Sequence, residues 1–179
     1  MSDQILPANP HSPGARLGSG DSGSSTWALI GFLAACYGVS AISGLITVEN
    51  VKTWYPMLNK PDWTPPSAVF GPVWGVLYGM MAVAAWLVWR EKDKDETAVR
   101  NALRLFWLQL VLNFAWSGLF FGMQRIDWAL WDISALWLAI IATMVAFWRV
   151  KPLAGMLMIP YLLWVSFATA LNFSIWKLN

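Results

Sequence analysis

The chain has 179 residues, of which 58% are hydrophobic and only 12% are charged, and it contains 14 tryptophans. A soluble protein of this length could not bury so much apolar surface, so the composition predicts a single domain in a lipid bilayer. The net charge of +2 is too small to indicate a nucleic-acid partner, and the single cysteine excludes an internal disulfide.

The first 25 residues are rich in Gly, Ser, Pro and Asp and contain no apolar run. Such a segment cannot bury enough surface to fold, so we expect residues 1–25 to form a disordered tail. It lacks the basic and apolar regions of a secretory signal. His11, the only histidine of the chain, lies in this tail, so no histidine is available in the membrane and no metal site is expected.

Five long apolar segments follow, each close to the roughly 20 residues that cross a ~30 Å hydrocarbon core. Backbone groups in lipid must be paired internally, so each segment is predicted to be a helix. The expected fold is an all-α integral membrane protein in which residues 26–179 form a bundle of five transmembrane helices. The helices are expected at about 26–46, 67–89, 102–123, 128–148 and 154–176.

The basic residues are distributed unequally between the two predicted ends of the bundle. Eight lie on the side of the N-terminus, and four, namely Lys52, Lys60, Arg125 and Lys177, lie on the other. The positive-inside rule therefore predicts a cytoplasmic N-terminus and places the loop after the first helix outside.

That loop is unusual in its composition. Trp54–Trp74 contains five prolines, three tryptophans and a tyrosine. Proline fixes φ and disfavours helix at the preceding residue, so the segment is predicted to be a stiff, ordered loop. Its aromatic side chains suit a membrane boundary, and we interpret the loop as a lid over a space between the helices.

Three helices carry aromatic and polar residues at helical spacing, which puts them on one face of each helix. If these faces converge, they form an aromatic cleft suited to a flat conjugated molecule. The alternative is that the aromatics are ordinary bundle core and the amides are interhelical hydrogen bonds. The faces comprise Trp74, Tyr78 and Met81; Gln109, Asn113, Trp116 and Ser117; and Tyr161, Trp164, Ala168, Leu171 and Asn172.

An acidic residue and two groups of small residues within the predicted helices can each be interpreted in more than one way. Asp132 lies within the fourth helix, where a carboxylate either serves a function or anchors the helix end. Small residues of the first helix, including Gly31 and Gly38, predict close helix approach, and the Gly118/Gly122 pair predicts packing within the bundle or between protomers. The chain offers no Ser/His/Asp set, no phosphate-binding glycine loop and no carboxylate pair in one span, so an enzyme is less expected than a binding protein.

The sequence resembles the tryptophan-rich sensory protein / translocator protein family, the TspO/MBR or peripheral-type benzodiazepine receptor family. The resemblance rests on WYPMLNKPDWTPPSAVFGPVWGVLYG at Trp54–Gly79, LNFAWSGLFFG at Leu112–Gly122, WALWD at Trp128–Asp132 and PYLLWVSFATALNFSIW at Pro160–Trp176. It implies a five-helix homodimer that binds porphyrins such as protoporphyrin IX and haem, with no obligatory cofactor. The implied ligand-binding residues are Tyr55, Pro65, Trp74, Asn113, Ser117, Trp164, Ala168 and Asn172.

Two positions depart from the family pattern. The sterol-recognition stretch usually contains a tyrosine, and Phe173 stands there without the phenolic hydroxyl, which weakens the expectation of sterol binding. The glycine pair of animal members corresponds to Arg104 and Leu108, so that dimer contact is not expected to transfer.

The leading hypothesis is a membrane sensor or receptor for tetrapyrroles. With no histidine in the membrane, we expect little preference for haem over metal-free porphyrin. The first alternative is an enzyme that degrades bound porphyrin in light, for which the resemblance implicates Trp74 and Trp164. The second is a transporter of porphyrin, lipid or sterol, which is less expected because the sequence shows no inverted repeat and no paired helix breaks.

Overall fold

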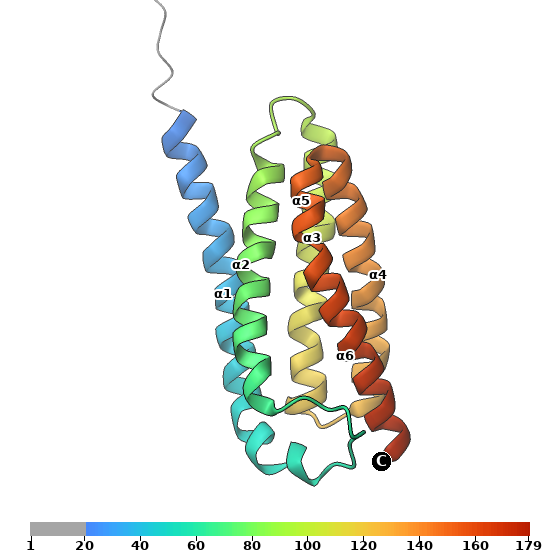
Figure 1. Ribbon diagram of the computed structural model, residues 1–179. Helices are drawn as coiled ribbons and strands as arrows, with labels where there is room; N and C mark the ends of the chain where they lie inside the picture. The colour runs from blue at the N-terminus through green and yellow to red at the C-terminus, as the bar shows by residue number, and fades with distance from the viewer. Residues whose placement is uncertain (1–20) are drawn as a thin grey trace, which may run out of the picture.

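The computed structural model describes residues 21–179 and shows a bundle of helices with no strand in this part of the chain (Figure 1). Five stretches are long and apolar enough to cross a membrane, which confirms the predicted all-α membrane fold. Two short 3₁₀ helices, η1 (Tyr55–Met57) and η2 (Ser67–Val69), lie in the loop after the first span. The other elements are α1 (Asp21–Thr53), α2 (Phe70–Trp89), α3 (Glu96–Ser117), the π-helix η3 (Gly118–Gly122), α4 (Ile126–Val150), α5 (Pro152–Leu157) and α6 (Ile159–Leu178).

The first helix is longer than the sequence predicted at both ends. It begins at Asp21 rather than Thr26 and ends at Thr53 rather than Ile46. The length of an apolar segment indicates only the part of a helix that crosses the membrane. The polar turns after Ile46 contain no residue that interrupts a helix before Pro56, so the helix continues. Residues 21–25 of the predicted disordered tail are therefore helical, and the rest of that tail, His11 included, lies outside the described residues.

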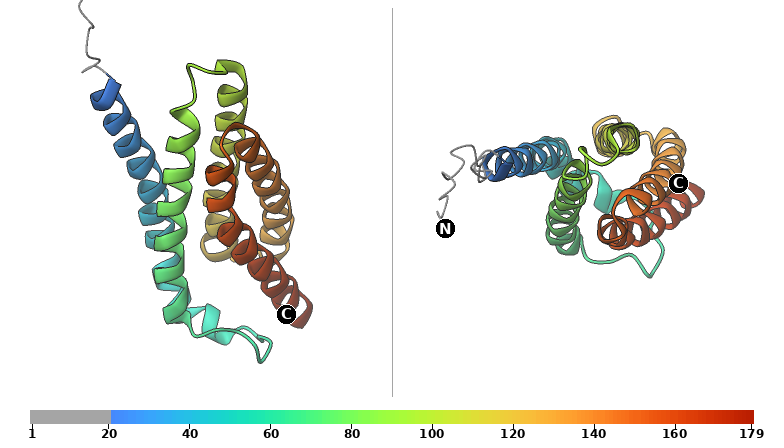
Figure 2. Two further views of the ribbon diagram at one scale, coloured as in Figure 1. Left: turned by 45° about the horizontal axis from the view of Figure 1, so that its top comes forward. Right: turned by 90° about the horizontal axis from the view of Figure 1, so that it is seen from above.

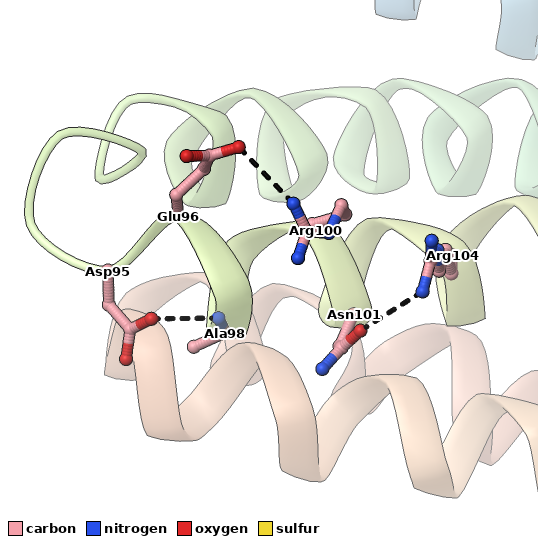
Figure 3. Close-up of polar contacts among 6 residues, drawn as sticks. All are labelled: Asp95, Glu96, Ala98, Arg100, Asn101 and Arg104. Carbon is pink, nitrogen blue, oxygen red and sulfur yellow. Dashed lines mark hydrogen bonds and ion pairs between the residues drawn. The ribbon is translucent and has the colours of Figure 1, made fainter.

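The third span also begins earlier than predicted, because a side chain caps it outside the apolar stretch. Asp95 Oδ1 accepts a hydrogen bond from the backbone N–H of Ala98 at 2.9 Å, and Glu96 pairs with Arg100 one turn later at 3.3 Å (Figure 3). An aspartate at the N-cap satisfies a backbone donor and suits the positive end of the helix dipole. The helix thus starts in a polar turn before its apolar face begins.

Two of the predicted continuous helices are interrupted. The third span changes from α-helix to π-helix at Gly118. The fifth is broken at Met158 into α5 and α6, two residues before Pro160, which lacks a backbone donor and crowds the preceding turn. From this break α6 leans away from α2 toward the C-terminal end, while α5 stays beside α2 (Figures 1 and 2).

The small-residue face of α1 does not form the close contact that the sequence predicted. Gly31 and Gly38 are exposed, and a Cβ added at either would meet no atom within 4 Å. The helix instead packs through Phe32 and Cys36, because larger apolar side chains bury more surface. 

The glycine pair of the third span is used within the bundle, at Gly122. A Cβ there would lie 3.2 Å from Cγ2 of Ile46 on α1, so the glycine permits close approach of the two spans. The homodimer implied by the resemblance stays a prediction.

Contacts between loops confirm which segments share an end of the bundle. At one end Lys151 pairs with Glu91 at 3.0 Å, and Lys94 pairs with the same carboxylate at 2.6 Å. Hydrogen bonds from Lys94 and Lys151 lower the pKa of the Glu91 carboxyl. At the other end Gln124 donates to Oδ1 of Asn50 at 3.1 Å. Lys94 and Lys151 thus lie at the same end of the bundle, as predicted. Arg16 lies outside the described residues, and the cytoplasmic position of the N-terminus stays a prediction.

Candidate ligand-binding site

A cavity of about 210 Å³ lies inside the bundle beneath the loop that joins α1 to α2. Its walls come from α1, α2, α3, the π-helix and α6, and the loop covers it at the C-terminal end of the molecule. The lining residues are Ser40, Ser43, Gly44, Thr47, Val51, Tyr55, Ser67, Phe70, Gly71, Trp74, Tyr78, Asn113, Trp116, Ser117, Phe120, Phe121, Trp164, Ala168, Leu171, Asn172 and Ile175.

All but one of the residues assigned to a ligand site from the sequence line this cavity. The exception is Pro65, which lies between the Thr64 turn and η2 and does not reach the wall. Ser67 and Phe70, just beyond it, line the cavity in its place. The residues brought together are Tyr55, Trp74, Asn113, Ser117, Trp164, Ala168 and Asn172.

The walls are predominantly aromatic. Trp74 lies against Tyr78 with ring centroids 5.7 Å apart, one turn along the same helix. Across the cavity Phe70 meets Trp164 edge to face at 5.8 Å. Indole, phenol and phenyl faces favour flat conjugated guests through offset or edge-to-face contact. The predicted convergence of the aromatic faces of α2 and α6 is therefore present.

Asn113 is the centre of a buried hydrogen-bond network. Its Oδ1 accepts from the Tyr78 hydroxyl, and its Nδ2 donates to the Tyr161 oxygen at 2.9 Å. The Tyr161 hydroxyl in turn donates to Oε1 of Gln109 at 2.9 Å. Both ends of the Asn113 amide are thus paired within the protein, so the amide joins three helices.

Asn172 is paired in the same way. Its Oδ1 accepts from the indole N–H of Trp116 at 3.0 Å, and its Nδ2 donates to the carbonyl of Ile126 at 3.1 Å. This contact holds α3, α4 and α6 together near the loop. For both amides, the geometry is that of the interhelical hydrogen bonds considered as the alternative reading of the sequence.

Lys60 fixes the shape of the loop over the cavity. Its ammonium group donates to the carbonyls of Tyr55 and Leu58 at 2.8 Å and to that of Pro56 at 3.2 Å. It also lies 5.1 Å from the centroid of the Tyr55 ring. Tyr55 is buried, with 6% of its surface exposed, so Lys60 fixes the turn that inserts this ring into the bundle.

A second set of contacts ties the loop to the end of α6. The backbone N–H of Asn59 donates to Oδ1 of Asn179 at 3.0 Å, and Nδ2 of Asn179 donates to the carbonyl of Asn59 at 2.9 Å. Trp63 packs edge to face on Phe167 at 5.6 Å. The loop is therefore an ordered cover fastened at two places, as its prolines predicted.

Comparison with known proteins assigns the chain to a family. The model of the TspO/MBR family matches residues 32–177. The chain belongs to the TspO/MBR family. It is 42% identical to the human translocator protein over 147 residues, which cover 82% of this chain and 86% of that protein. It is 41% identical to a tryptophan-rich sensory protein of Cereibacter sphaeroides over 154 residues, covering 86% and 92% of the two chains.

A third relative is the tryptophan-rich protein TspO of Chlorobaculum tepidum, which is 41% identical over 151 residues and covers 82% of this chain and 92% of its own length. The match to the TspO/MBR family model includes the residues that line the cavity, the covering loop and most or all of each of the five spans. The family assignment and the five spans together establish an integral, multi-pass membrane protein.

Sequence reasoning missed one whole wall of the cavity in this TspO/MBR chain. Five residues of α1 line it: Ser40, Ser43, Gly44, Thr47 and Val51. Their spacing of three or four residues was a usable signal, but small and hydroxyl side chains at that spacing look like a helix-packing face. 

Two phenylalanines of the π-helix were also not predicted to line the cavity. Phe120 and Phe121 line the cavity and lie 6.3 and 5.9 Å from the Tyr55 ring. They follow Ser117 in a quoted motif, but the π-helix at Gly118–Gly122 changes the helical register after Ser117, so α-helical spacing does not predict which of these side chains face the cavity.

Other predicted features lie apart from the cavity. Asp132 does not line it, and its Oδ2 is buried with no hydrogen-bond partner among residues 21–179. In the sterol-recognition stretch Leu171 is buried and faces the cavity, whereas Phe173 is exposed on the outside of the bundle. The two residues therefore lie on different faces of α6.

Proposed function

We propose that this TspO/MBR protein is a membrane sensor or receptor that binds a tetrapyrrole, such as protoporphyrin IX, in the cavity under the loop. The observation that carries the proposal is the composition of the walls. Aromatic rings from α2, α3, the π-helix, α6 and the loop surround one space, and the two amides that line it are already paired. A large, flat and mostly apolar guest suits such a site.

Binding such a guest requires the closed site to expand. The cavity measures about 210 Å³, whereas pockets for drug-sized ligands measure roughly 300–1,000 Å³. The parts able to move are the covering loop, held to the end of α6 by polar contacts of Asn59, and the ring of Trp164, whose indole N–H has no partner among residues 21–179. The proposal therefore includes opening of the site when the ligand enters.

The proposal also predicts the relative affinity of the site for haem and for metal-free porphyrin. His11, the only histidine, precedes the first span, so an imidazole ligand for haem iron is absent from the spans. Protoporphyrin IX and haem should bind with similar affinity, because ring stacking contributes equally to both. A strong preference for haem with a low-spin absorption spectrum would contradict this account.

The test uses two matched substitutions on α6. Ala168 faces the cavity, and Ala170, two residues along, is exposed on the outside. Ala168→Leu fills part of the cavity, and overpacking of this kind weakens binding by about 1–3 kcal/mol, which is roughly fivefold to a hundredfold. Ala170→Leu adds the same side chain outside.

The measurement is titration of purified protein with protoporphyrin IX in the dark, following tryptophan quenching and the porphyrin absorption band. We expect saturable binding that is weakened in Ala168→Leu and unchanged in Ala170→Leu. Non-saturating quenching that is equal in all three proteins would mean that the porphyrin only partitions into detergent, and the proposal would be wrong.

A further inference from the structure

A groove of about 600 Å³ runs along the outer surface of the bundle between α2 and α6. Its sides are apolar: Pro72 and Val76 come from α2, and Leu163 and Phe167 come from α6. Val76 and Leu163 are 63% and 65% exposed, so the groove opens on the surface that faces lipid in a membrane-spanning bundle. We propose that this groove is a lateral entrance through which a ligand dissolved in the bilayer reaches the cavity, with Trp164 as its gate.

Trp164 separates the groove from the cavity. It lines the outer groove together with Leu163 and Phe167, and it also lines the inner cavity together with Ala168. A single indole is thus in contact with both spaces. Rotation of that side chain would join them, with no displacement of a helix. This inference rests on the proposed function, because the cavity is its destination.

The indole of Trp164 is held differently from those of three other partly buried tryptophans. Trp116 donates its N–H to Asn172 at 3.0 Å, Trp137 donates to Ser166 at 2.8 Å, and Trp86 donates to the carbonyl of Ser25 at 2.9 Å. The N–H of Trp164 is buried and has no partner in residues 21–179. Moving this ring therefore breaks no hydrogen bond of its own, and a buried unpaired donor gains by reaching a partner.

Apolar contacts hold Trp164 in place, among them two with aromatic rings. Its centroid lies 5.8 Å from that of Phe70 on α2 and 5.5 Å from that of Phe167 on α6. Such contacts contribute about 0.5–1.5 kcal/mol each beyond their buried area, and a flat conjugated ligand entering between the helices would replace them with contacts of the same kind. The gate is thus suited to an aromatic guest.

The backbone explains why an entrance forms at this seam. The break at Met158 lets α6 lean away from α2, so the two helices diverge toward the covering loop, as both views show (Figures 1 and 2). Side chains rather than close helix packing fill the space between them. Pro72, near the start of α2, and Pro160, near the start of α6, both line this groove.

Entry from the water side would be harder than entry from the bilayer. It would require lifting the loop, which breaks the three hydrogen bonds between Asn59 and the end of α6, two with Asn179 and one with the carbonyl of Leu178. The lateral route breaks none of these bonds. It also takes an apolar ligand directly from hydrocarbon, where such a molecule accumulates.

The experiment measures association and dissociation rates of protoporphyrin IX by stopped flow with the protein in lipid nanodiscs. Val76→Trp and Leu163→Trp each narrow the groove from one side. Leu138→Trp, at a position on α4 that is 62% exposed and outside the groove, is the matched control. We expect both groove variants to slow association and dissociation by the same factor, at least fivefold, and to leave Kd within twofold. A gate changes the barrier and not the two end states, so the rates change together.

A further variant, Asn179→Ala, loosens the covering loop and distinguishes the two routes. With a lateral entrance it leaves the association rate unchanged. If both groove variants bind at wild-type rates, or if only Asn179→Ala changes the kinetics and associates faster, the proposed lateral entrance is wrong. Neither result would contradict the proposed binding of the ligand in the cavity. Absence of saturable binding in the wild type would instead refute the proposed function, and with it the entrance for this ligand.

Discussion

Replacing Lys60 with methionine should loosen the turn at residues 55–60 within the loop that covers the cavity. The ammonium group makes two part-buried hydrogen bonds to the carbonyls of Tyr55 and Leu58 and one exposed bond to that of Pro56. Hydrogen bonds to charged groups contribute about 1.5–3 kcal/mol each, so the two part-buried bonds give about 3 kcal/mol at the lower value. Ordering the lysine side chain costs about 1.5 kcal/mol. The net loss is about 1.5 kcal/mol, which raises the open fraction of the loop roughly tenfold.

Amide hydrogen exchange over residues 54–66 measures that opening directly. We expect exchange in this segment to become about ten times faster in Lys60→Met, with no change in the transmembrane spans. Lys52→Met is the control, because Lys52 is an exposed lysine at the same end of the bundle. If both variants exchange at the wild-type rate, Lys60 does not hold the loop and the energetic reasoning is wrong.

Three further predictions address the network, one loop and the chemistry of the site. Asn113→Ala removes the acceptor of the buried Tyr78 hydroxyl and the donor to the Tyr161 oxygen, and should lower the free energy of unfolding by about 1–2 kcal/mol. Asn101→Ala on the exposed side of the same helix should not, and equal stability of the two variants would refute the structural role of the Asn113 amide. Because ion pairing lowers the pKa of Glu91, its stabilisation is present at neutral pH and is lost as pH falls through the folded-state pKa. Glu91→Gln should therefore unfold about 1 kcal/mol more easily at pH 7 and match wild type in acid, and a difference that persists in acid would contradict the linkage. If the protein degrades porphyrin in light, Trp74→Phe and Trp164→Phe should slow the loss of porphyrin absorption when several porphyrins are consumed per protein. An unchanged rate would show that these indoles line the cavity without taking part in the reaction.

Much of the cavity was predictable because helical spacing fixes which residues share a face. Trp74 and Tyr78 are one turn apart on α2, and Trp164 and Ala168 are one turn apart on α6. An α-helix of known register leaves little freedom in such cases. The loop was predictable for a different reason, since its prolines restrict the backbone before any tertiary contact forms.

The rest depended on packing that spacing does not encode. The orientation of α1 was misjudged because its small residues could face either a helix or lipid, and burial of Phe32 and Cys36 decided the matter. The π-turn at Gly118 changes the register of the helix, which no apolar pattern reveals. Likewise, only the three-dimensional arrangement shows that the Asn113 amide is used up by Tyr78 and Tyr161.

The internal pairing of both cavity amides affects the ligand selectivity that is expected of the cavity. Because Asn113 and Asn172 already have partners, their amides give the cavity no strong preference for one arrangement of polar groups on a ligand. Two buried atoms of lining residues, the Ser43 hydroxyl and the Trp164 indole N–H, have no partner among residues 21–179. If the cavity binds ligands as proposed, an added or missing methylene changes affinity by only about 1–3 kcal/mol, and flat compounds of different chemistry compete for the same space. Substitutions in the aromatic walls would then alter selectivity without disturbing the hydrogen bonds that hold the helices together.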